Sequence, residues 1–386
     1  MSKKPEIVIT FPDCIGGVAS FNRNIINYSS IKDRFSTHVI LIRSKEDKRP
    51  VFTDPIEADK ISRFHFSFNE NQYHVCKRFN NLLGNDPGCI VTDNDITLKA
   101  IAIGNNPKAV LFLVHDYFYV NYALEFEPVI DAAIAHSSFF KDILCAAMPA
   151  SYSNKAFYIP YGVEQPEVTK KEKHESLNVV FLGRLVEEKG IFELKKIDDL
   201  LRMQNVSVNW TIIGSGPLET VLKEQWTSKT NVTFVKPAIT KEVYQILQSQ
   251  DIQVLPTTFE GTPVSILECM ANGAVPVVSD LPGGIRDVVR EEIGFRCKVN
   301  DPNSFAEALL YLSKNREKLS ELQRNCLQVA KEKYDINIAA DDYFEFFLKY
   351  SDKAGSKKTI NINFSRLDKP YLPNALVKFT RNLMNK

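Results

Sequence analysis

Short apolar runs rich in β-branched residues alternate with longer amphipathic stretches along most of the chain. Such runs are typical of buried strands, whereas apolar residues that recur every three or four positions are typical of helices. Strands that alternate with helices favour an α/β architecture with parallel sheets. The strands expected from this pattern cover residues 7–11, 37–42, 61–66, 89–92, 110–114, 132–136, 179–182, 208–213, 232–235, 252–255 and 275–278.

The alternation pauses at the polar stretch 162–176, which has the composition of a linker. A chain of 386 residues is also longer than one compact domain usually is. We therefore predict two Rossmann-like, doubly wound domains at residues 1–165 and 166–336, and C-terminal helices with a basic tail at residues 337–386. Because ligands of such sheets bind beyond the carboxyl ends of the strands, we expect the active site in a cleft between the domains.

The tail mixes basic and apolar side chains. Residues 353–386 hold eight Lys or Arg and one acidic residue, interleaved with Leu372, Leu376, Val377, Phe379 and Leu383. One interpretation is that this segment lies on an anionic membrane leaflet, where each near-surface cation contributes ~1 kcal/mol. The other is that the C-terminal helices cross back and bury these apolar side chains on the N-terminal domain.

Composition excludes several classes of protein. An apolar content of 44% is ordinary for a globular protein, and a net charge of +1 argues against a nucleic-acid binder. No apolar run approaches the ~20 residues of a membrane span, and the first residues do not have the pattern of a signal peptide. The seven scattered cysteines include no C-x-x-C pair, so we expect reduced thiols and a cytoplasmic location.

The most informative segment runs from Phe259 to Glu268, where Glu260 and Glu268 stand eight positions apart. Glu260 lies in a Gly/Thr/Pro turn after an expected strand, and Pro263 suits the first position of the following helix. Backbone N–H groups at such a helix start favour anions, and carboxylates accept hydrogen bonds from sugar hydroxyls. The segment can therefore hold a nucleoside diphosphate joined to a sugar, although a solvated pair of glutamates at this spacing also arises by chance.

Other candidate ligands also follow expected strands. Arg184 and Lys189 follow residues 179–182 and could bind a diphosphate without a metal, although both could equally be surface cations. His115 follows residues 110–114 and could bind a sugar hydroxyl, or form a helix-capping pair with the next residue. Glycines suited to close backbone approach also follow strands: Gly16, Gly17, Gly183, Gly214 and Gly216.

The sequence Asp93-Asn94-Asp95 has the form of a metal-binding D-x-D motif. Aspartate is also a good helix N-cap, and we interpret this segment as an acidic helix start. No His, Cys and Asp set has zinc spacing, so no metal site and no cofactor are expected.

Taken together, these segments resemble glycosyltransferase family 4, whose members are retaining enzymes of the GT-B fold. The resemblance is strongest from Asn178 to Val289. There it includes FLGRL with EKG at 181–190, GSGP at 214–217, both glutamates, CMANG at 269–273, VPVV at 275–278 and GG at 283–284. In the first half it is thinner and covers GGV at 16–18, HD at 115–116, AHS at 135–137 and IPYGV at 159–163.

The resemblance implies a role for each candidate. Arg184 and Lys189 would clamp the diphosphate, and Glu268 would bind the ribose. Glu260 would bind the hydroxyls of the donor sugar, together with backbone N–H groups of the turn that runs from Gly261 through Thr262 and Pro263 to Val264. Gly17 would lie near phosphate and acceptor, and His115 would contact the donor sugar. The catalytic set is thus Glu260, His115, Arg184 and Lys189.

The implied reaction is transfer of a hexose from a UDP- or GDP-sugar to a hydroxyl of a glycan or lipid-linked acceptor, with retention, in the cytoplasm or at the inner face of the membrane. Two departures from the family pattern, Tyr161 and Lys236-Pro237, leave the choice between UDP and GDP open. An epimerase of the same fold and a catalytically silent binding subunit are the alternatives, and the intact set of Arg184, Lys189, Glu260 and Glu268 argues against the second.

Overall fold

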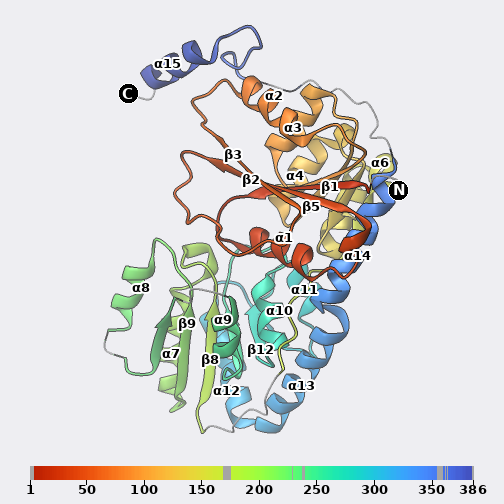
Figure 1. Cartoon of the computed structure of the whole chain (residues 1–386). Helices are drawn as coiled ribbons and strands as arrows, with labels where there is room; N and C mark the ends of the chain where they lie inside the picture. The colour runs from red at the N-terminus through yellow and green to blue at the C-terminus, as the bar shows by residue number, and fades with distance from the viewer. Residues whose placement is uncertain are drawn as a thin grey trace. The chain divides into compact units, whose positions relative to one another are not determined.

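The computed structural model describes residues 4–167, 175–227, 229–236, 240–353, 360, 362 and 364–384. The chain divides into two compact units (Figure 1). Unit 1 comprises Met1–His136, Phe140–Ile159 and Asn337–Lys386, and unit 2 comprises Ser137–Phe139 and Pro160–Ile336. Parts of three segments named in the sequence analysis lie outside the described residues: 168–174 of the expected linker, Pro237, and residues 354–359, 361, 363, 385 and 386 of the tail.

Unit 1 is built on a seven-stranded parallel sheet with the order β3-β2-β1-β4-β5-β6-β7. Its strands are β1 (Glu6–Pro12), β2 (Ser36–Ser44), β3 (Lys60–Phe66), β4 (Gly88–Thr92), β5 (Ala109–Val114), β6 (Ala132–Ala135) and β7 (Ala156–Tyr158). Its helices are α1 (Gly17–Tyr28), α2 (Gln72–Leu83), α3 (Asp95–Gly104), α4 (Tyr117–Glu125), α5 (Ser138–Ala147), α6 (Pro149–Lys155), α14 (Ile336–Ser351) and α15 (Asn374–Met384).

Unit 2 is built on a six-stranded parallel sheet with the order β10-β9-β8-β11-β12-β13. Its strands are β8 (Leu177–Leu182), β9 (Val208–Ile213), β10 (Val232–Val235), β11 (Ile252–Leu255), β12 (Val275–Ser279) and β13 (Phe295–Cys297). Its helices are α7 (Glu193–Met203), α8 (Glu219–Gln225), α9 (Thr240–Leu247), α10 (Val264–Ala271), α11 (Gly284–Val288), α12 (Pro302–Lys314) and α13 (Arg316–Lys333).

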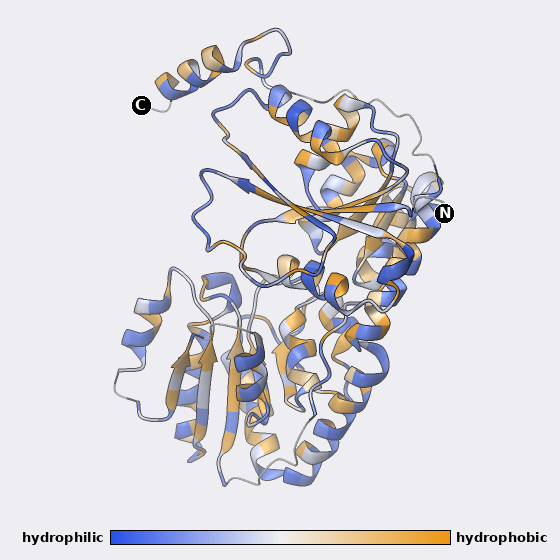
Figure 2. Ribbon diagram, in the orientation of Figure 1, coloured by the Kyte–Doolittle hydropathy of each residue, from blue (hydrophilic) through white to orange (hydrophobic). Residues whose placement is uncertain are grey.

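The expected α/β class with two doubly wound sheets is therefore confirmed. Central strands are buried on both faces, as in β5, where every residue is buried. Figure 2 shows the same pattern in colour, because the strands are largely hydrophobic while most helices carry both hydrophobic and hydrophilic residues. The pattern analysis missed β7 and β13, since each has only three residues and so shows no periodicity.

In both sheets the chain order reverses beside the first strand. β1 pairs with β2 on one side and β4 on the other, and β8 pairs with β9 and β11. Helices that follow the two neighbours of such a strand lie on opposite faces, which leaves space beyond its carboxyl end. The loops after β1 and β8 are therefore the places where each unit offers backbone to a ligand.

Helix α14 belongs to unit 1 and packs on it through aromatic and polar contacts. Phe344 stacks on Phe35 with ring centroids 4.4 Å apart, and Asp341 accepts a hydrogen bond from the backbone N–H of Ser30 at 2.7 Å. Tyr343 is fully buried, and its hydroxyl donates to the carbonyl oxygen of Ile159 at 2.8 Å. The C-terminal segment thus completes the core of the first unit.

Helix α15 contacts the same unit but does not bury the apolar side chains of the tail. Val377 is buried, whereas Leu376, Phe379 and Leu383 are exposed. The expectation that packing on the N-terminal domain would bury these residues is therefore wrong for three of them. In the part of the chain that the structure describes, no helix is long and apolar enough to span a bilayer.

We predict that Tyr343→Phe lowers the free energy of unfolding by about 1–3 kcal/mol. The substitution removes a buried hydroxyl that donates to the carbonyl of Ile159 and lies 2.7 Å from Nδ1 of His136, so two buried hydrogen bonds are lost. Urea unfolding compared with Tyr311→Phe, a change at a half-exposed side chain of α12, measures the loss. Equal stability of the two variants would contradict a structural role for this hydroxyl.

Candidate functional site

In unit 2, two loops that follow neighbouring strands are joined by backbone contacts. The carbonyl of Glu188, after β8, accepts hydrogen bonds from the backbone N–H of Thr258 and the hydroxyl of Thr257, both at 2.8 Å. Gly190 has φ +66°, and a Cβ there would lie 2.0 Å from the carbonyl oxygen of Pro256 after β11. Glycine is therefore required for this approach, and the approach fixes the position of the residue before it.

That residue, Lys189, forms an ion pair with Glu260. Both side chains are largely buried, with exposed fractions of 15% for Lys189 and 11% for Glu260. The sequence analysis assigned these residues to different parts of a ligand, and the structure shows that they are also partners of each other. It also places Lys189 in a 3-10 turn, Glu187–Lys189, ahead of α7, which begins at Glu193.

Arg184 lies in the same loop as Lys189, two residues beyond the end of β8. Its side chain is exposed and makes no hydrogen bond or ion pair with any residue that the structure describes. The two cations of this loop thus differ, since Lys189 is paired with a carboxylate, whereas the guanidinium donors of Arg184 bind no described residue. A guanidinium binds the oxygens of a phosphate with two parallel hydrogen bonds.

The turn after Glu260 is buried and leads directly into α10. Gly261, Thr262 and Pro263 are buried, and Pro263 is the N-cap residue rather than the first helical residue, so the predicted position was wrong by one. Pro263 makes no side-chain capping bond to this helix, whose first residue is Val264. Its backbone N–H groups at the first turn are the donors that a helix start offers to anions.

Glu268 lies on α10, one helical turn beyond Val264, and is half-buried. Thr262 is fixed from the other side, because the backbone N–H of Gly284 donates to the carbonyl of Gly261 at 3.1 Å. A Cβ at Gly284 would lie 1.9 Å from the Thr262 hydroxyl oxygen, so only glycine permits this contact. The pair Gly283-Gly284 therefore supports the turn that presents Glu260 and the start of α10.

The glycines after β8 and β9 also serve backbone packing. A Cβ at Gly214 would lie 1.9 Å from the carbonyl oxygen of Gly183, and one at Gly216 would lie 2.4 Å from that of Leu185. The backbone N–H of Leu185 donates to Ser215 at 2.9 Å. These contacts hold the loop of Arg184 against the next loop, which is sufficient reason for both glycines whether or not a nucleotide approaches them.

The predicted residues of unit 1 gather at the carboxyl edge of its sheet. Gly16 and Gly17 follow β1, and a Cβ added to either would meet no atom within 4 Å, so the surface above them is open. His115 follows β5 and is buried, with Nε2 3.7 Å from Oδ2 of Asp93 after β4. Asp116 caps α4 by accepting from the backbone N–H of Phe118 at 2.7 Å, so the capping role belongs to the aspartate alone.

His136 extends this group toward α14. Its ring lies 4.6 Å from that of His115, and its Nδ1 lies 2.7 Å from the hydroxyl of Tyr343. Because that hydroxyl gives its hydrogen to Ile159, the network assigns the hydrogen of this contact to Nδ1 of His136. Burial, and to a lesser extent the neighbouring His115, hold the pKa of His136 well below its usual range, so the ring is neutral at neutral pH.

The D-x-D sequence is divided among three local tasks. Asn94 is the N-cap of α3 and accepts from the backbone N–H of Thr97 at 3.0 Å, and Asp95 pairs with Lys99 at 2.6 Å. The carboxylate of Asp93 lies beside the ring of His115 instead. The sequence analysis missed this last contact, although the position of both residues after neighbouring strands could have indicated it. No group of three or more His, Cys, Asp or Glu side chains in the described ranges is arranged to hold a metal ion.

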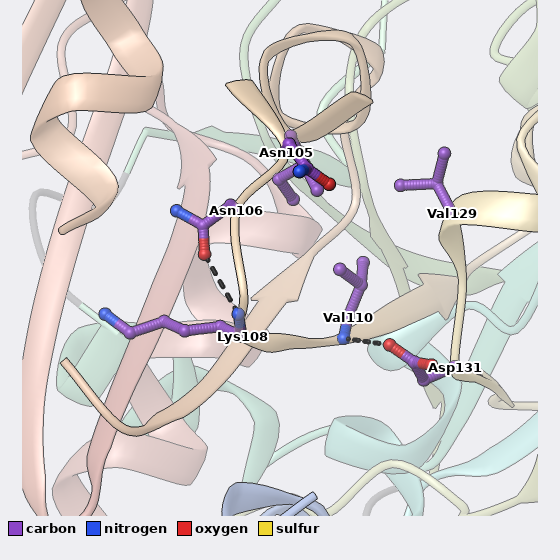
Figure 3. Close-up of a pocket in the computed structure, with 7 residues that line it drawn as sticks. Asn105, Asn106, Lys108, Val110, Val129 and Asp131 are labelled. Carbon is purple, nitrogen blue, oxygen red and sulfur yellow. Dashed lines mark hydrogen bonds between the residues drawn. The ribbon is translucent and has the colours of Figure 1, made fainter. Parts of the chain in front are cut away.

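A pocket at the other edge of the unit 1 sheet has a different character (Figure 3). Asn106 accepts from the backbone N–H of Lys108 at 3.1 Å, and Asp131 accepts from that of Val110 at 2.9 Å. The ammonium of Lys108 is bound to Glu6 at 2.6 Å. The polar groups here satisfy the start of β5, so they stabilise the fold and leave the carboxyl edges as the candidate site.

Comparison with known proteins finds a family match in the second half of the chain. Residues 164–332 match the family model of the glycosyl transferases group 1. A colanic acid biosynthesis glycosyltransferase of Escherichia coli K12, named as putative, is 31% identical over 147 residues, which are 36% of this chain and 36% of that protein. An amylovoran biosynthesis glycosyltransferase of Erwinia amylovora is 32% identical over 165 residues, which are 39% of this chain and 40% of that protein.

A third relative, from Escherichia coli, is a UDP-Gal:alpha-D-GlcNAc-diphosphoundecaprenol alpha-1,3-galactosyltransferase. It is 27% identical over 188 residues, which are 45% of this chain and 48% of that protein. The matched part of the chain thus spans less than half the length of each of these relatives.

Solved structures extend the likeness to the fold of nearly the whole chain. A crystal structure of Anabaena HepE in complex with UDP and glucose has a TM-score of 0.70 at 15% identity, covering 89% of this chain and 99% of that one. Sucrose-phosphate synthase from Thermosynechococcus elongatus has a TM-score of 0.70 at 16% identity, covering 90% and 99%. At this identity the likeness shows the fold alone, which is GT-B.

Proposed function

We propose that the protein is a retaining glycosyltransferase, because residues 164–332 match the family model of the glycosyl transferases group 1. It transfers a hexose from a UDP- or GDP-sugar to a hydroxyl of a glycan or lipid-linked acceptor. The observation that carries this proposal is the Lys189–Glu260 pair, which joins the loop of Arg184 after β8 to the turn that leads into α10, the helix of Glu268.

Charge and geometry divide this arrangement into parts that fit a sugar nucleotide. Arg184 and the N–H groups that begin α10 supply donors for a diphosphate, and Lys189 supplies a second cation. Glu260 and Glu268 accept hydrogen bonds from hydroxyls, the first from the sugar and the second from the ribose. The leaving diphosphate is the group on which negative charge develops, so stabilising it is the main electrostatic task.

The proposed mechanism needs no pair of catalytic carboxylates. The acceptor attacks on the face from which the diphosphate departs, and a phosphate oxygen of the donor takes the acceptor proton. The proposed role of His115 is contact with the donor sugar, and its orientation is set by Asp93 and the neighbouring His136. Gly16 and Gly17, above which the surface is open, let phosphate and acceptor approach the backbone.

Synthesis of a bacterial envelope glycan is the setting that the relatives support. Two of them are named for colanic acid and amylovoran biosynthesis, and a third for an acceptor carried on diphosphoundecaprenol. Because such an acceptor lies in a membrane, we place the proposed reaction at the inner face of the membrane, with the protein bound peripherally.

The function is tested by incubating the protein with UDP- and GDP-sugars and following both nucleotide release and sugar transfer. Thermal shift identifies the donor first, because a ligand that binds only the folded state raises its melting temperature. Transfer that requires an acceptor and keeps the anomeric configuration supports the proposal. Nucleotide release at full rate without any acceptor would instead indicate an epimerase, and failure of every sugar nucleotide to bind would contradict the proposal.

Arg184→Ala should weaken binding of UDP or GDP about tenfold to a hundredfold. A charge-assisted hydrogen bond contributes ~1.5–3 kcal/mol, and Arg184 has no other described partner to which those donors are committed. Calorimetry compares it with Arg324→Ala, a change at an exposed arginine of α13. If the two variants bind both nucleotides alike, Arg184 is not part of the diphosphate site.

The two glutamates should differ in their effect on the nucleotide alone. Glu268→Ala should weaken binding of UDP or GDP, because the ribose is part of both. Glu260→Ala should leave bare nucleotide binding unchanged or tighter, because its removal releases Lys189 from the ion pair, while turnover and affinity for the sugar nucleotide fall. Equal loss of bare nucleotide affinity in both variants would reject this division.

Activity should survive EDTA, because Arg184, Lys189 and the start of α10 supply positive charge to the diphosphate. The measurement is the transfer rate after chelation and dialysis, with and without added Mn²⁺ or Mg²⁺. If chelation abolished transfer and either ion restored it, a metal would be needed, and Asp93 and Asp95 would become the candidate ligands.

A further inference from the structure

Helix α15 is attached to unit 1 through its polar side. Asn374 at its start accepts a hydrogen bond from the backbone N–H of Asn71 at 2.8 Å. Arg381 in its last turn donates to the carbonyl of Phe68 at 3.0 Å and pairs with Asp368 at 2.8 Å. Directional hydrogen bonds at both ends of the helix therefore fix which side faces the unit.

The opposite side of α15 is apolar and exposed. Leu376, Phe379 and Leu383 follow one another at helical spacing, and their exposed fractions are 52%, 63% and 58%. We call these three side chains the outer face of α15. A surface helix normally turns its apolar stripe inward, and here the polar side is held inward instead, so the outer face remains in contact with water.

Two exposed aromatic side chains belong to the same part of unit 1. Phe68 is 60% exposed and lies in the loop to which Arg381 is bound, and Tyr371, 77% exposed, lies three residues before the helix. Tyrosine, an aromatic side chain with one polar end, is favoured at the boundary between water and lipid. Exposed apolar side chains in this part of unit 1 are thus not limited to the helix.

The charge around this surface is positive. Arg366, Lys369 and Lys378 form no ion pair with any residue in the described part of the chain. Residues 353–386 hold eight Lys or Arg and one acidic residue, although the whole chain has a net charge of only +1. The basic residues are therefore concentrated in the segment that carries the outer face, while the rest of the chain is net negative.

We propose that the outer face of α15 is a membrane-docking surface for a bilayer rich in anionic lipid. Leu376, Phe379 and Leu383 enter the headgroup region, and the neighbouring cations bind anionic headgroups. The inference rests on the proposed function for its purpose, since a lipid-linked acceptor lies in the same bilayer. A second copy of the chain fits less well, because pairing through this face would bring two basic segments together.

The test is cosedimentation of the full chain with vesicles of phosphatidylcholine alone or mixed with phosphatidylglycerol, at low and at physiological salt. The protein should bind the mixed vesicles, less so as salt rises. The double variant Phe379→Ser/Leu383→Ser should bind at least about tenfold more weakly. The control Met203→Ser/Val221→Ser, which changes two exposed apolar side chains of unit 2, should bind as the unchanged protein does.

A second variant, Phe379→Trp, reports insertion directly. The two native tryptophans, Trp210 and Trp226, are buried in unit 2, so a blue shift of emission on adding mixed vesicles comes from the new side chain. No sedimentation at low salt, equal binding by the double serine variant, or a concentration-dependent dimer that this variant abolishes would each overturn the proposal. Nucleotide binding by the same variants, measured separately, distinguishes failure of this inference from failure of the proposed function.

Discussion

The close backbone contact between the loops after β8 and β11 determines the geometry of the unit 2 site. It depends on Gly190, whose missing Cβ lets the carbonyl of Pro256 approach, and on the hydrogen bonds that the carbonyl of Glu188 accepts. Neighbouring strands of a parallel sheet end at one edge, so their loops meet there, but only bare backbone lets them meet this closely. The Lys189–Glu260 pair is a consequence of that contact.

A comparable dependence holds in unit 1, where a helix from the far end of the chain supports the histidines. Tyr343 of α14 contacts Nδ1 of His136, and the ring of His136 lies against that of His115. A buried neutral imidazole keeps its orientation only if its ring nitrogens are matched, and the hydroxyl of Tyr343 matches one of them. The position of His115 therefore depends on a residue more than two hundred positions away in the sequence.

The sequence predicted what periodicity and strand ends determine, and missed what depends on contacts between loops. Long strands and helices were found because burial imposes a period, while β7 and β13 are too short to show one. Placement of Glu260, Glu268 and Arg184 after strands or on α10 followed from the order of elements. The Lys189–Glu260 pair could not be predicted, since it depends on the approach at Gly190. The contact of Asp93 with His115 was missed, although both residues follow neighbouring strands.

The ion pair also constrains how the proposed donor would bind. Lys189 and Glu260 are largely shielded from water, and a shielded charge that loses its partner must gain another of similar quality. A diphosphate offers Lys189 new acceptors, but it has no hydrogen-bond donor for the carboxylate of Glu260. A sugar attached to the diphosphate supplies hydroxyl donors for the carboxylate at the same time. Under the proposed function, the pair therefore favours the complete sugar nucleotide over its nucleotide product. Only the sugar nucleotide supplies both acceptors for Lys189 and hydroxyl donors for Glu260.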